Sequence, residues 1–188
     1  MKATEVLVSE HKNILRILTV VKKLCIEVYN TKKVHYEGFF DAIDFIRNYA
    51  DKFHHGKEED ILFDKMSAEL GVEIKNGPIY GMLAEHDLGR LFIKNLEDAL
   101  LRSKEGHDNA EIDIIANATC YTDLLHRHID KEDTAIFTFA ERSFDQKTKE
   151  IVDEAFEASK IRLNSDETEA KYVALLEKLE QYTQDIKF

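Results

Sequence analysis

Apolar residues recur every three or four positions over most of the chain, which is the spacing of helices that bury one face. This pattern predicts four long helices followed by two shorter ones. The long helices are expected over about residues 4–30, 36–66, 78–106 and 108–143, and the shorter ones over about 145–162 and 165–183. Long helices with short connections indicate an up-down four-helix bundle, so the sequence predicts an all-α fold.

Residues that interrupt helices are rare, and their positions set the expected boundaries. The chain has 7 glycines and 1 proline. Residues 71–77 are expected to break the pattern, with Pro78 as the first residue of the third helix, because proline there gives up no helical hydrogen bond. Asp108, Asp145 and Ser165 are predicted to cap the helices that follow them.

Two parts of the chain differ in their chemistry. Residues 1–143 hold all 8 histidines, and residues 145–188 hold none. We expect the first part to form the four-helix bundle and the second to be an appendage of two helices packed on the same domain. A histidine-based site would then belong to the bundle alone.

An internal repeat relates the two halves of the predicted bundle. The pattern H-x-x-K-E-[ED]-x-x-[LI]-F occurs at His54 and again at His128, 74 positions later. A Glu-His pair at residues 10–11 recurs at residues 85–86, 75 positions later. Two matches at nearly one offset predict two copies of a helix pair, packed with pseudo-twofold symmetry.

The spacing within this repeat places metal-binding side chains on common faces. Residues four apart lie on one side of a helix, so His54 pairs with Glu58, and His128 pairs with Glu132. With the histidines of the Glu-His pairs, the core would hold four imidazoles and two carboxylates, which requires cations. Imidazole and carboxylate without thiolate favour iron or manganese over zinc. Two carboxylates can bridge a metal pair and leave a position open on each metal for a small molecule.

These motifs resemble those of the hemerythrin family, in its broad hemerythrin-like (HHE cation-binding) form. The resemblance covers about residues 1–143: an early histidine in the first helix, HxxxE in the second, EHD in the third and HxxxE in the fourth. It implies a non-heme centre of two iron ions (Fe2+/Fe3+), bridged by an oxo or hydroxo group and by the two glutamates. The ligands that it implies are His11, His54, Glu58, His86, His128 and Glu132.

The chain departs from the oxygen-carrying members of that family at two points. Those members have HxxxH in the third helix, whereas Arg90 occupies the second histidine position here. They also have an aspartate five residues after the last histidine, which corresponds to Asp133. The internal repeat favours Glu132 as the ligand because it matches Glu58, and Asp133 is the alternative.

The set of four histidines and two glutamates is similar to that of di-iron proteins linked to iron–sulfur repair and nitrosative stress. This resemblance implies a protein that reacts with O2, peroxide or nitric oxide, in defence against oxidative or nitrosative stress or in iron–sulfur repair. Its partners would be that small ligand and an electron-donor protein. A reversible oxygen-binding, storage or sensing protein is the alternative. The sequence leaves open whether the chain is a di-iron oxidoreductase.

Several residues near these motifs have competing interpretations. The repeat supports neither His55 nor His126 as a ligand in another register. Solvated histidine is the better interpretation of two further positions, His35 and His107. Glu59 and Asp133 are expected to face water or to hold an outer hydrogen bond to a ligand. Glu10 and Glu85 are interpreted as surface charges, in preference to salt-bridge partners.

Four other side chains have candidate roles in the core or beside the centre. Phe63 and Phe137 are expected to pack the core. Tyr121 is expected to fill the core, in preference to donating a hydrogen bond to bound peroxide. Arg90 is a candidate for lining a channel or for pairing with a bridging carboxylate.

The composition of the chain argues against some classes of partner and indicates its cellular compartment. A formal net charge of −11 argues against nucleic acid or an anionic membrane as the main partner, since both require clustered Lys and Arg. No stretch approaches the roughly 20 apolar residues of a membrane span. Cys25 and Cys120 are too few for a disulfide framework and too isolated for a thiolate metal site. We therefore expect a cytoplasmic protein, of unknown oligomeric state.

Overall fold

The fold is helical throughout the part of the chain that the structure describes. The computed structural model describes residues 1–107 and 109–187, and these contain no β-strand. The first two long helices are α1 (Lys2–Thr31) and a composite of α2 (Tyr36–Phe45), η1 (Ile46–His55), η2 (Glu58–Phe63) and α3 (Asp64–Glu69). The η segments are π-helical, with i→i+5 hydrogen bonds and a wider turn than an α-helix. The predicted all-α fold is confirmed.

The remaining helices follow the same order as the sequence pattern. The third long helix consists of α4 (Val72–Ile74), η3 (Lys75–Ile79) and α5 (Tyr80–Lys104). The fourth consists of α6 (Ala110–Lys131), η4 (Glu132–Ile136) and α7 (Phe137–Ser143). The two shorter helices are α8 (Gln146–Arg162) and α9 (Ser165–Tyr182).

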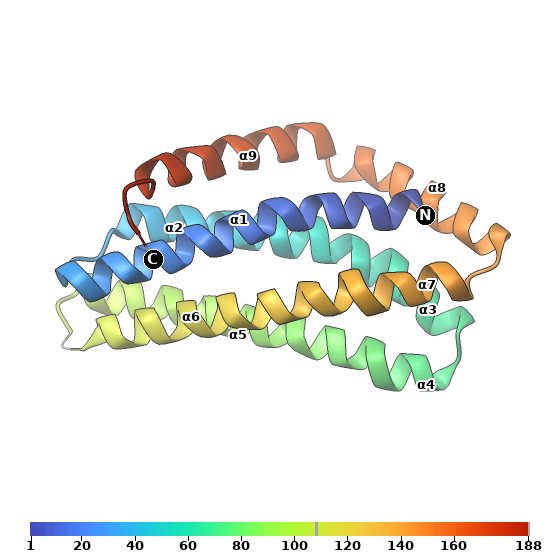
Figure 1. Ribbon diagram of the computed structural model, residues 1–188, viewed down its shortest axis with the longest axis horizontal. Coiled ribbons are helices and arrows are strands. Elements are labelled where there is room, and N and C mark those ends of the chain that lie inside the picture. Colours follow the sequence, from blue (N-terminus) through green and yellow to red (C-terminus); the bar gives the residue numbers. More distant parts are fainter. Residues whose placement is uncertain (108, 188) are drawn as a thin grey trace.

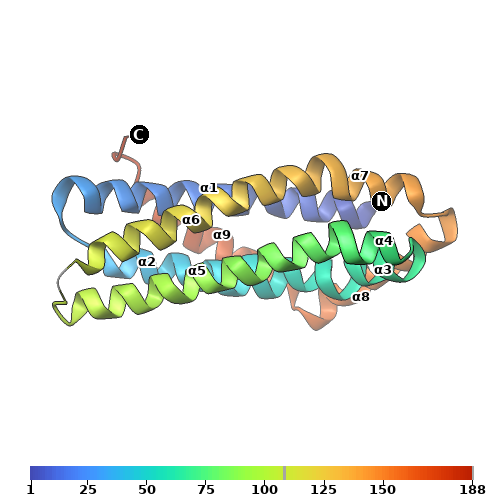
Figure 2. The ribbon, with the colours of Figure 1, turned by 90° about the horizontal axis from the view of Figure 1, so that it is seen from below.

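The four long helices run lengthwise beside one another, and α8 and α9 lie along one side of them (Figures 1 and 2). Helix α5 packs on α6, and α6 packs on α1. Helix α9 contacts α1, α2 and η1, whereas α8 contacts α1 and η2. The C-terminal helices therefore lie against the first helix pair.

Three predicted boundaries differ from the structure, and one is confirmed. The break predicted over residues 71–77 is shorter than expected: the helix stops before Gly71, whose φ is 94°, and starts again at Val72. Pro78 lies inside the π-helical segment η3 rather than at the helix start. Asn164, not Ser165, is the N-cap of α9, with a left-handed φ of 47°. Asp145 does cap α8, because its side chain accepts a hydrogen bond from Thr148 N at 2.7 Å.

Asp108, the predicted cap of the fourth helix, lies outside the described residues. The helix begins at Ala110, and Asn109 is its N-cap with a left-handed φ of 65°. No side chain caps this helix among the described residues.

A polar layer divides the interior of the bundle into two apolar clusters. In α1, Leu7 belongs to one cluster and Ile14 to the other, with His11 between them. The same change of cluster occurs along each of the other three long helices, and it falls at their histidine and glutamate motifs. Phe63 and Phe137 are buried in the cluster that includes Leu7, as predicted. The clusters thus hold the polar layer away from the ends of the bundle.

A search of the described helices found none with the length and apolar character needed to cross a membrane.

Candidate metal centre

Six buried side chains from the four long helices meet in the polar layer. Each is 2% exposed or less: His11, His54, Glu58, His86, His128 and Glu132. α1 and α5 contribute one histidine each, and the two HxxxE motifs contribute the rest. The structure therefore brings together all six residues that the sequence predicts as ligands.

Each of the two glutamates faces both pairs of histidines. Glu58 Oε1 lies 3.4 Å from Nε2 of His54 and 4.0 Å from Nε2 of His11, and its Oε2 lies 3.7 Å from Nε2 of His86. Glu132 Oε2 lies 3.3 Å from Nε2 of His11, and its Oε1 lies 3.1 Å from Nε2 of His128 and 3.9 Å from Nε2 of His86. Each carboxylate thus directs one oxygen toward a histidine of the first helix pair and the other oxygen toward a histidine of the second, as a bridging ligand requires.

The outer nitrogen of every one of these four histidines is held by a carboxylate. The Nδ1 to oxygen distances are 2.8 Å for His11–Asp133, 2.9 Å for His54–Glu10, 2.7 Å for His86–Glu59 and 2.9 Å for His128–Glu85. A carboxylate on Nδ1 fixes the tautomer, so that Nε2 is free to bind a metal. All four Nε2 atoms consequently face the two glutamates.

Comparison with protein families decides which group of proteins this arrangement belongs to. The family model described as the hemerythrin HHE cation-binding domain matches residues 2–140. The chain belongs to the hemerythrin HHE cation-binding domain family. Searches of curated proteins and of solved structures found no significant match.

The buried oxygens of this hemerythrin-like domain fit bound cations. All four carboxylate oxygens of Glu58 and Glu132 lack a hydrogen-bond partner among the described residues, and so does Nε2 of His11. Burying two carboxylates without partners is costly, and metal ions would remove that cost. Two groups of ligand atoms lie close enough to hold an ion, one of His11, His54, Glu58 and Glu132, and one of His55, Glu58, His86 and His128.

The buried carboxylates raise the pKa of two of these histidines. Burial lowers the pKa of His11, but hydrogen bonding to Asp133 and the carboxylates of Glu132 and Glu58 outweigh burial and raise it to about 10. Burial also lowers the pKa of His86, but contacts with Glu132, Glu59 and Glu58 outweigh burial and raise it to about 9. For Glu132, burial raises the pKa, but the charge of His128 and contacts with the other histidines hold it well below its usual value. The centre therefore favours positive charge from either protons or metals.

Two glutamates that sequence analysis placed on the surface belong to the centre. Glu10 is 5% exposed and binds His54 together with the buried Lys57. Glu85 is half-buried and binds His128 together with Lys131. The prediction of surface charges was wrong, because each glutamate reaches across to the histidine of a neighbouring helix. Their repeated position before a histidine was the signal for this role.

The residues that follow the two central glutamates, Glu58 and Glu132, also hold histidines. Glu59 binds His86, and Asp133 binds His11, as the alternative of an outer hydrogen bond predicted. Asp133 therefore engages an outer nitrogen, whereas Glu132 directs its oxygens into the centre. This arrangement favours Glu132 over Asp133 as the bridging residue.

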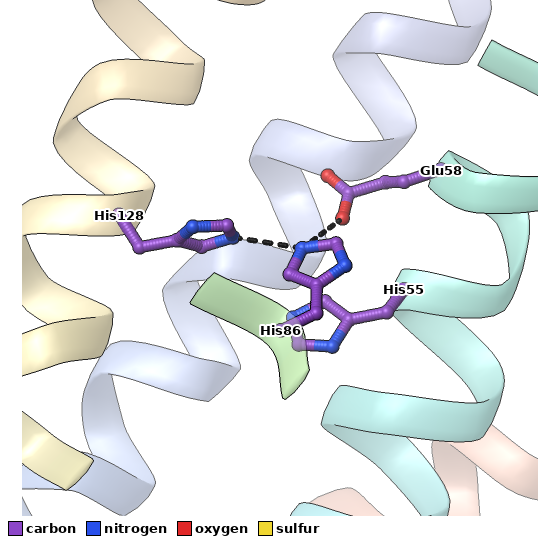
Figure 3. A group of neighbouring side chains, drawn as sticks. All are labelled: His55, Glu58, His86 and His128. Atoms are coloured by element: carbon purple, nitrogen blue, oxygen red, sulfur yellow. Dashed lines mark hydrogen bonds and ion pairs between the residues drawn. The ribbon is translucent and has the colours of Figure 1, made fainter. Parts of the chain in front are cut away.

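Sequence analysis missed one histidine at this hemerythrin-like centre. His55 is 5% exposed and stacks on His86, with ring centroids 3.8 Å apart and an interplanar angle of 9°. Figure 3 shows the two rings overlapping beside Glu58 and His128. His55 follows His54 within π-helical η1, and both side chains are buried, as are His128 and Ile129 at the matching positions of α6. The other alternative from the sequence, His126, is exposed.

A cavity of about 280 Å³ reaches the centre between η1 of the first helix pair and α5 and α6 of the second. Its lining includes His55, His86 and His128, together with Gly89 and Tyr121. A Cβ atom at Gly89 would lie 3.5 Å from both Leu125 Cδ2 and Tyr121 Cε2, so larger side chains there would enter this space. The cavity gives a small molecule a place beside the histidines.

Arg90 and Tyr121 both line this cavity, and neither contacts a bridging carboxylate. Arg90 binds Asp51 at 2.7 Å and Glu59 at 2.6 Å and lines the cavity, so the structure favours the first of its two candidate roles, lining a channel, over pairing with Glu58 or Glu132. Tyr121 is 2% exposed and belongs to the larger apolar cluster, as predicted.

The remaining histidines and cysteines lie elsewhere. His35 is the N-cap of α2, where its Nδ1 accepts a hydrogen bond from Gly38 N, and His107 is 62% exposed. Cys25 is buried in the core and Cys120 is exposed, and both are free. No thiolate therefore belongs to the groups of ligand atoms found among the described residues.

Proposed function

We propose that this chain binds two iron ions in its polar layer and reacts there with a small molecule, namely O2, peroxide or nitric oxide. One observation carries the proposal: two buried glutamates direct four unpartnered oxygens toward two pairs of imidazole nitrogens. The proposed bridging ligands are Glu58 and Glu132, and the proposed terminal ligands are His11, His54, His86 and His128.

The donor atoms support iron among the available metals. Imidazole nitrogen with carboxylate oxygen and no thiolate suits iron or manganese, whereas structural zinc favours four tight tetrahedral ligands. Bound iron would supply redox chemistry and open coordination positions for a small ligand. The role in oxidative or nitrosative stress, or in iron–sulfur repair, follows from this chemistry and belongs to the proposal.

The residues around the ligands orient them and limit access by water. Four carboxylates hold the outer nitrogens of the histidines, and Lys57 and Lys131 each neutralise one of these carboxylates. The two apolar clusters exclude water from both ends of the layer. The cavity beside His86 and His128 leaves one side open to a small molecule.

The test is to purify the protein without oxygen, count metals per chain and record the visible spectrum before and after air is admitted. We expect about two irons per chain, as in other carboxylate-rich sites of helix bundles, and an absorption change on exposure to air. A change that persists until a reductant is added would support redox reaction. Peroxide and nitric oxide would then be compared with O2 by their consumption in the presence of that reductant.

The other outcomes separate the alternatives. A spectrum that reverts when oxygen is removed would favour reversible binding, storage or sensing. A single zinc, or no metal, would contradict the proposal. His126→Ala is the control for loss of an exposed histidine, because residue 126 lies outside the groups of ligand atoms.

A further inference from the structure

We propose that the cavity beside the metal centre is a binding site for a neutral phenol of one ring, whose hydroxyl pairs with the hydroxyl of Tyr121. The ring of this ligand lies against the apolar wall of the cavity, next to Gly89. Binding in this place needs no metal. The role of the phenol as a substrate of the centre rests on the proposed function, because the reaction takes place there.

The size of the cavity is the first argument. Its volume is about 280 Å³. By comparison, an apolar cavity of about 150 Å³ holds benzene, and one water molecule takes up about 30 Å³ of the liquid. A diatomic gas or peroxide would leave most of the cavity unfilled. The space therefore fits an organic molecule with the bulk of a substituted ring.

The hydroxyl of Tyr121 is the second argument. Tyr121 is 2% exposed and lines the cavity, yet its hydroxyl has no hydrogen-bond partner among the described residues. Burial raises the pKa of Tyr121, and so does the charge of Asp51, another residue of the lining, so this hydroxyl keeps its proton. A buried polar group without a partner is costly, and a ligand O–H group can both donate to this hydroxyl and accept from it.

The wall next to Tyr121 is apolar and leaves space at one glycine. Ile46, Ile93 and Leu125 belong to the lining. A Cβ atom at Gly89 would lie 3.5 Å from Cε2 of the Tyr121 ring and 3.5 Å from Leu125 Cδ2. A ligand ring that occupies this space contacts the Tyr121 ring, and aromatic rings in contact attract each other beyond the effect of buried area. The wall therefore favours an aromatic ligand over an aliphatic one.

The charges of the lining favour a neutral ligand. Apart from Lys52, which is exposed, the charged side chains of the lining are held in ion pairs among the described residues. These ion pairs are Arg47–Glu97, Arg90–Asp51 and Lys131–Glu85. A carboxylate or ammonium group of a ligand would lose its water inside the cavity without meeting a free counter-charge, which is costly.

The inner end of the cavity brings the ligand to the metal centre. His55, His86 and His128 line the cavity, and Figure 3 shows these three side chains grouped together. Tyr121 precedes His128 by seven residues on α6, so the two side chains are on one face of that helix. A phenol bound to Tyr121 therefore lies beside the place where a small molecule would react.

Phenol and toluene are the probes, because they have similar size and differ in the hydroxyl group. Equilibrium dialysis would measure the affinity of both for the chain as purified and after its metals are removed. The variants are Tyr121→Phe, which removes the hydroxyl, and Gly89→Ile, which fills the space beside it. Tyr80→Phe is the matched control, because Tyr80 is 68% exposed and lies outside the lining. Circular dichroism would confirm that each variant keeps its helix content.

The expected results differ between the variants. Tyr121→Phe should lower the ratio of phenol affinity to toluene affinity by about fivefold or more, because the phenol hydroxyl loses its partner. Gly89→Ile should weaken binding of both probes by about tenfold or more, because the larger side chain takes the place of the ring. Tyr80→Phe should match wild type.

A second measurement uses the metal-free wild-type chain and does not depend on the variants. Nuclear Overhauser effects between bound phenol and the methyl groups of Ile93 and Leu125 would support the proposal. Effects confined to methyl groups outside the lining would overturn it. This measurement also decides the matter if Gly89→Ile fails to fold.

Further outcomes separate this inference from the proposed function. An unchanged affinity ratio in Tyr121→Phe would overturn the pairing with Tyr121, and phenol binding that requires metals would show coordination to the metals instead. A chain that binds two irons and no phenol would overturn this inference alone. A chain that binds phenol in the cavity and no iron would support the binding site and overturn the proposed function.

Discussion

The two helix pairs of the bundle carry the same ligand motif but differ in what surrounds it. Each pair supplies two central histidines, one central glutamate and a lysine–glutamate pair behind one histidine. In the first pair, η1 and η2 are π-helical around the motif, and α8 and α9 pack on the outside. In the second pair, the only π-helical segment that the structure describes at the motif is η4 of the fourth helix, and the helices α5 and α6 line one side of the cavity whose other side is η1.

Individual positions of the repeat show where this difference arises. His55 in the first pair corresponds to Ile129 in the second, and Gly89 in the second corresponds to Ile14 in the first. The first exchange adds a histidine, and the second opens space beside the centre. Pseudo-symmetry therefore holds for the motif itself, whereas the extra buried histidine and the space beside the centre are decided by single positions next to it.

The largest expected effect comes from removing the metals. A ligand present at about 1,000 times its Kd stabilises the folded chain by about 4 kcal/mol, so a chelator should lower the melting temperature by about 10 °C. Amides of α5 should lose more protection against hydrogen exchange than those of α1, which α8 and α9 contact. Equal losses in the two helices would show that the C-terminal helices do not make the pairs unequal.

The next largest effect should come from replacing Glu10 and Glu85, which hold the outer nitrogens of His54 and His128. This effect should differ between the two helix pairs. In Glu10→Gln, Lys57 would remain 3% exposed without its partner, which should cost about 3 kcal/mol of unfolding free energy. In Glu85→Gln, the side chain of Lys131 is 42% exposed, so the cost should be below about 1 kcal/mol. Denaturant unfolding of the metal-free variants measures both, and equal costs would contradict the comparison.

Replacing the bridging glutamates should instead affect both pairs alike. Glu58→Gln and Glu132→Gln each remove a charge that faces both pairs of histidines, so each should weaken binding of the metal pair by about 100-fold or more. Metal titration against a chelator measures this loss, with the exposed Glu73→Gln as the control. A loss confined to one variant would show that only one glutamate bridges.

Closing the cavity should produce a smaller effect, on reaction rate alone. Gly89→Ile places in the second pair the residue that the first pair has at position 14. The larger side chain would fill space next to Tyr121 and Leu125 and should slow the reaction of the metal-loaded protein with small molecules severalfold. Metal affinity should not change. An unchanged rate, measured by stopped-flow absorption, would show that small molecules enter by another path.

The smallest effect is a release of protons on metal binding, to which both pairs should contribute. His11 and His86 have pKa values of about 10 and about 9 in the metal-free chain, so both are protonated at pH 7. A metal binds neutral imidazole, so binding should release about one proton from each and strengthen as pH rises toward 9. Calorimetry in buffers with different ionisation enthalpies counts these protons. No release at pH 7 would contradict the raised pKa values.

The helices and the six central residues could be predicted from the sequence because both depend on local periodicity. Residues four apart on an α-helix share a face, and the repeat selected one register for His54, Glu58, His128 and Glu132. The structure brings these residues together with His11 and His86, and their role as ligands stays a prediction.

Other features depend on geometry that periodicity does not contain. His55 was set aside because the repeat aligns it with Ile129, and a repeat of motifs does not reveal that the imidazole stacks on His86 of another helix. Glu10 and Glu85 were interpreted as surface charges because their partners are on neighbouring helices, which a pattern along one helix does not reveal. Pro78 lies within a helix for a similar reason, since π-helical η3 accommodates it.

The division of the interior into two apolar clusters has a consequence for cooperative unfolding. Helix α8 contributes Val152 and Phe156 to the smaller cluster, whereas α9 contributes Tyr172 and Leu176 to the larger one. Helices α8 and α9 contact each other on the outside of the bundle, so among the described residues they connect the two clusters past the layer of charged groups. Metals in that layer would join the four long helices at mid-length, so that both ends melt as one unit. Without them, we expect each end to open on its own, beginning with the smaller cluster.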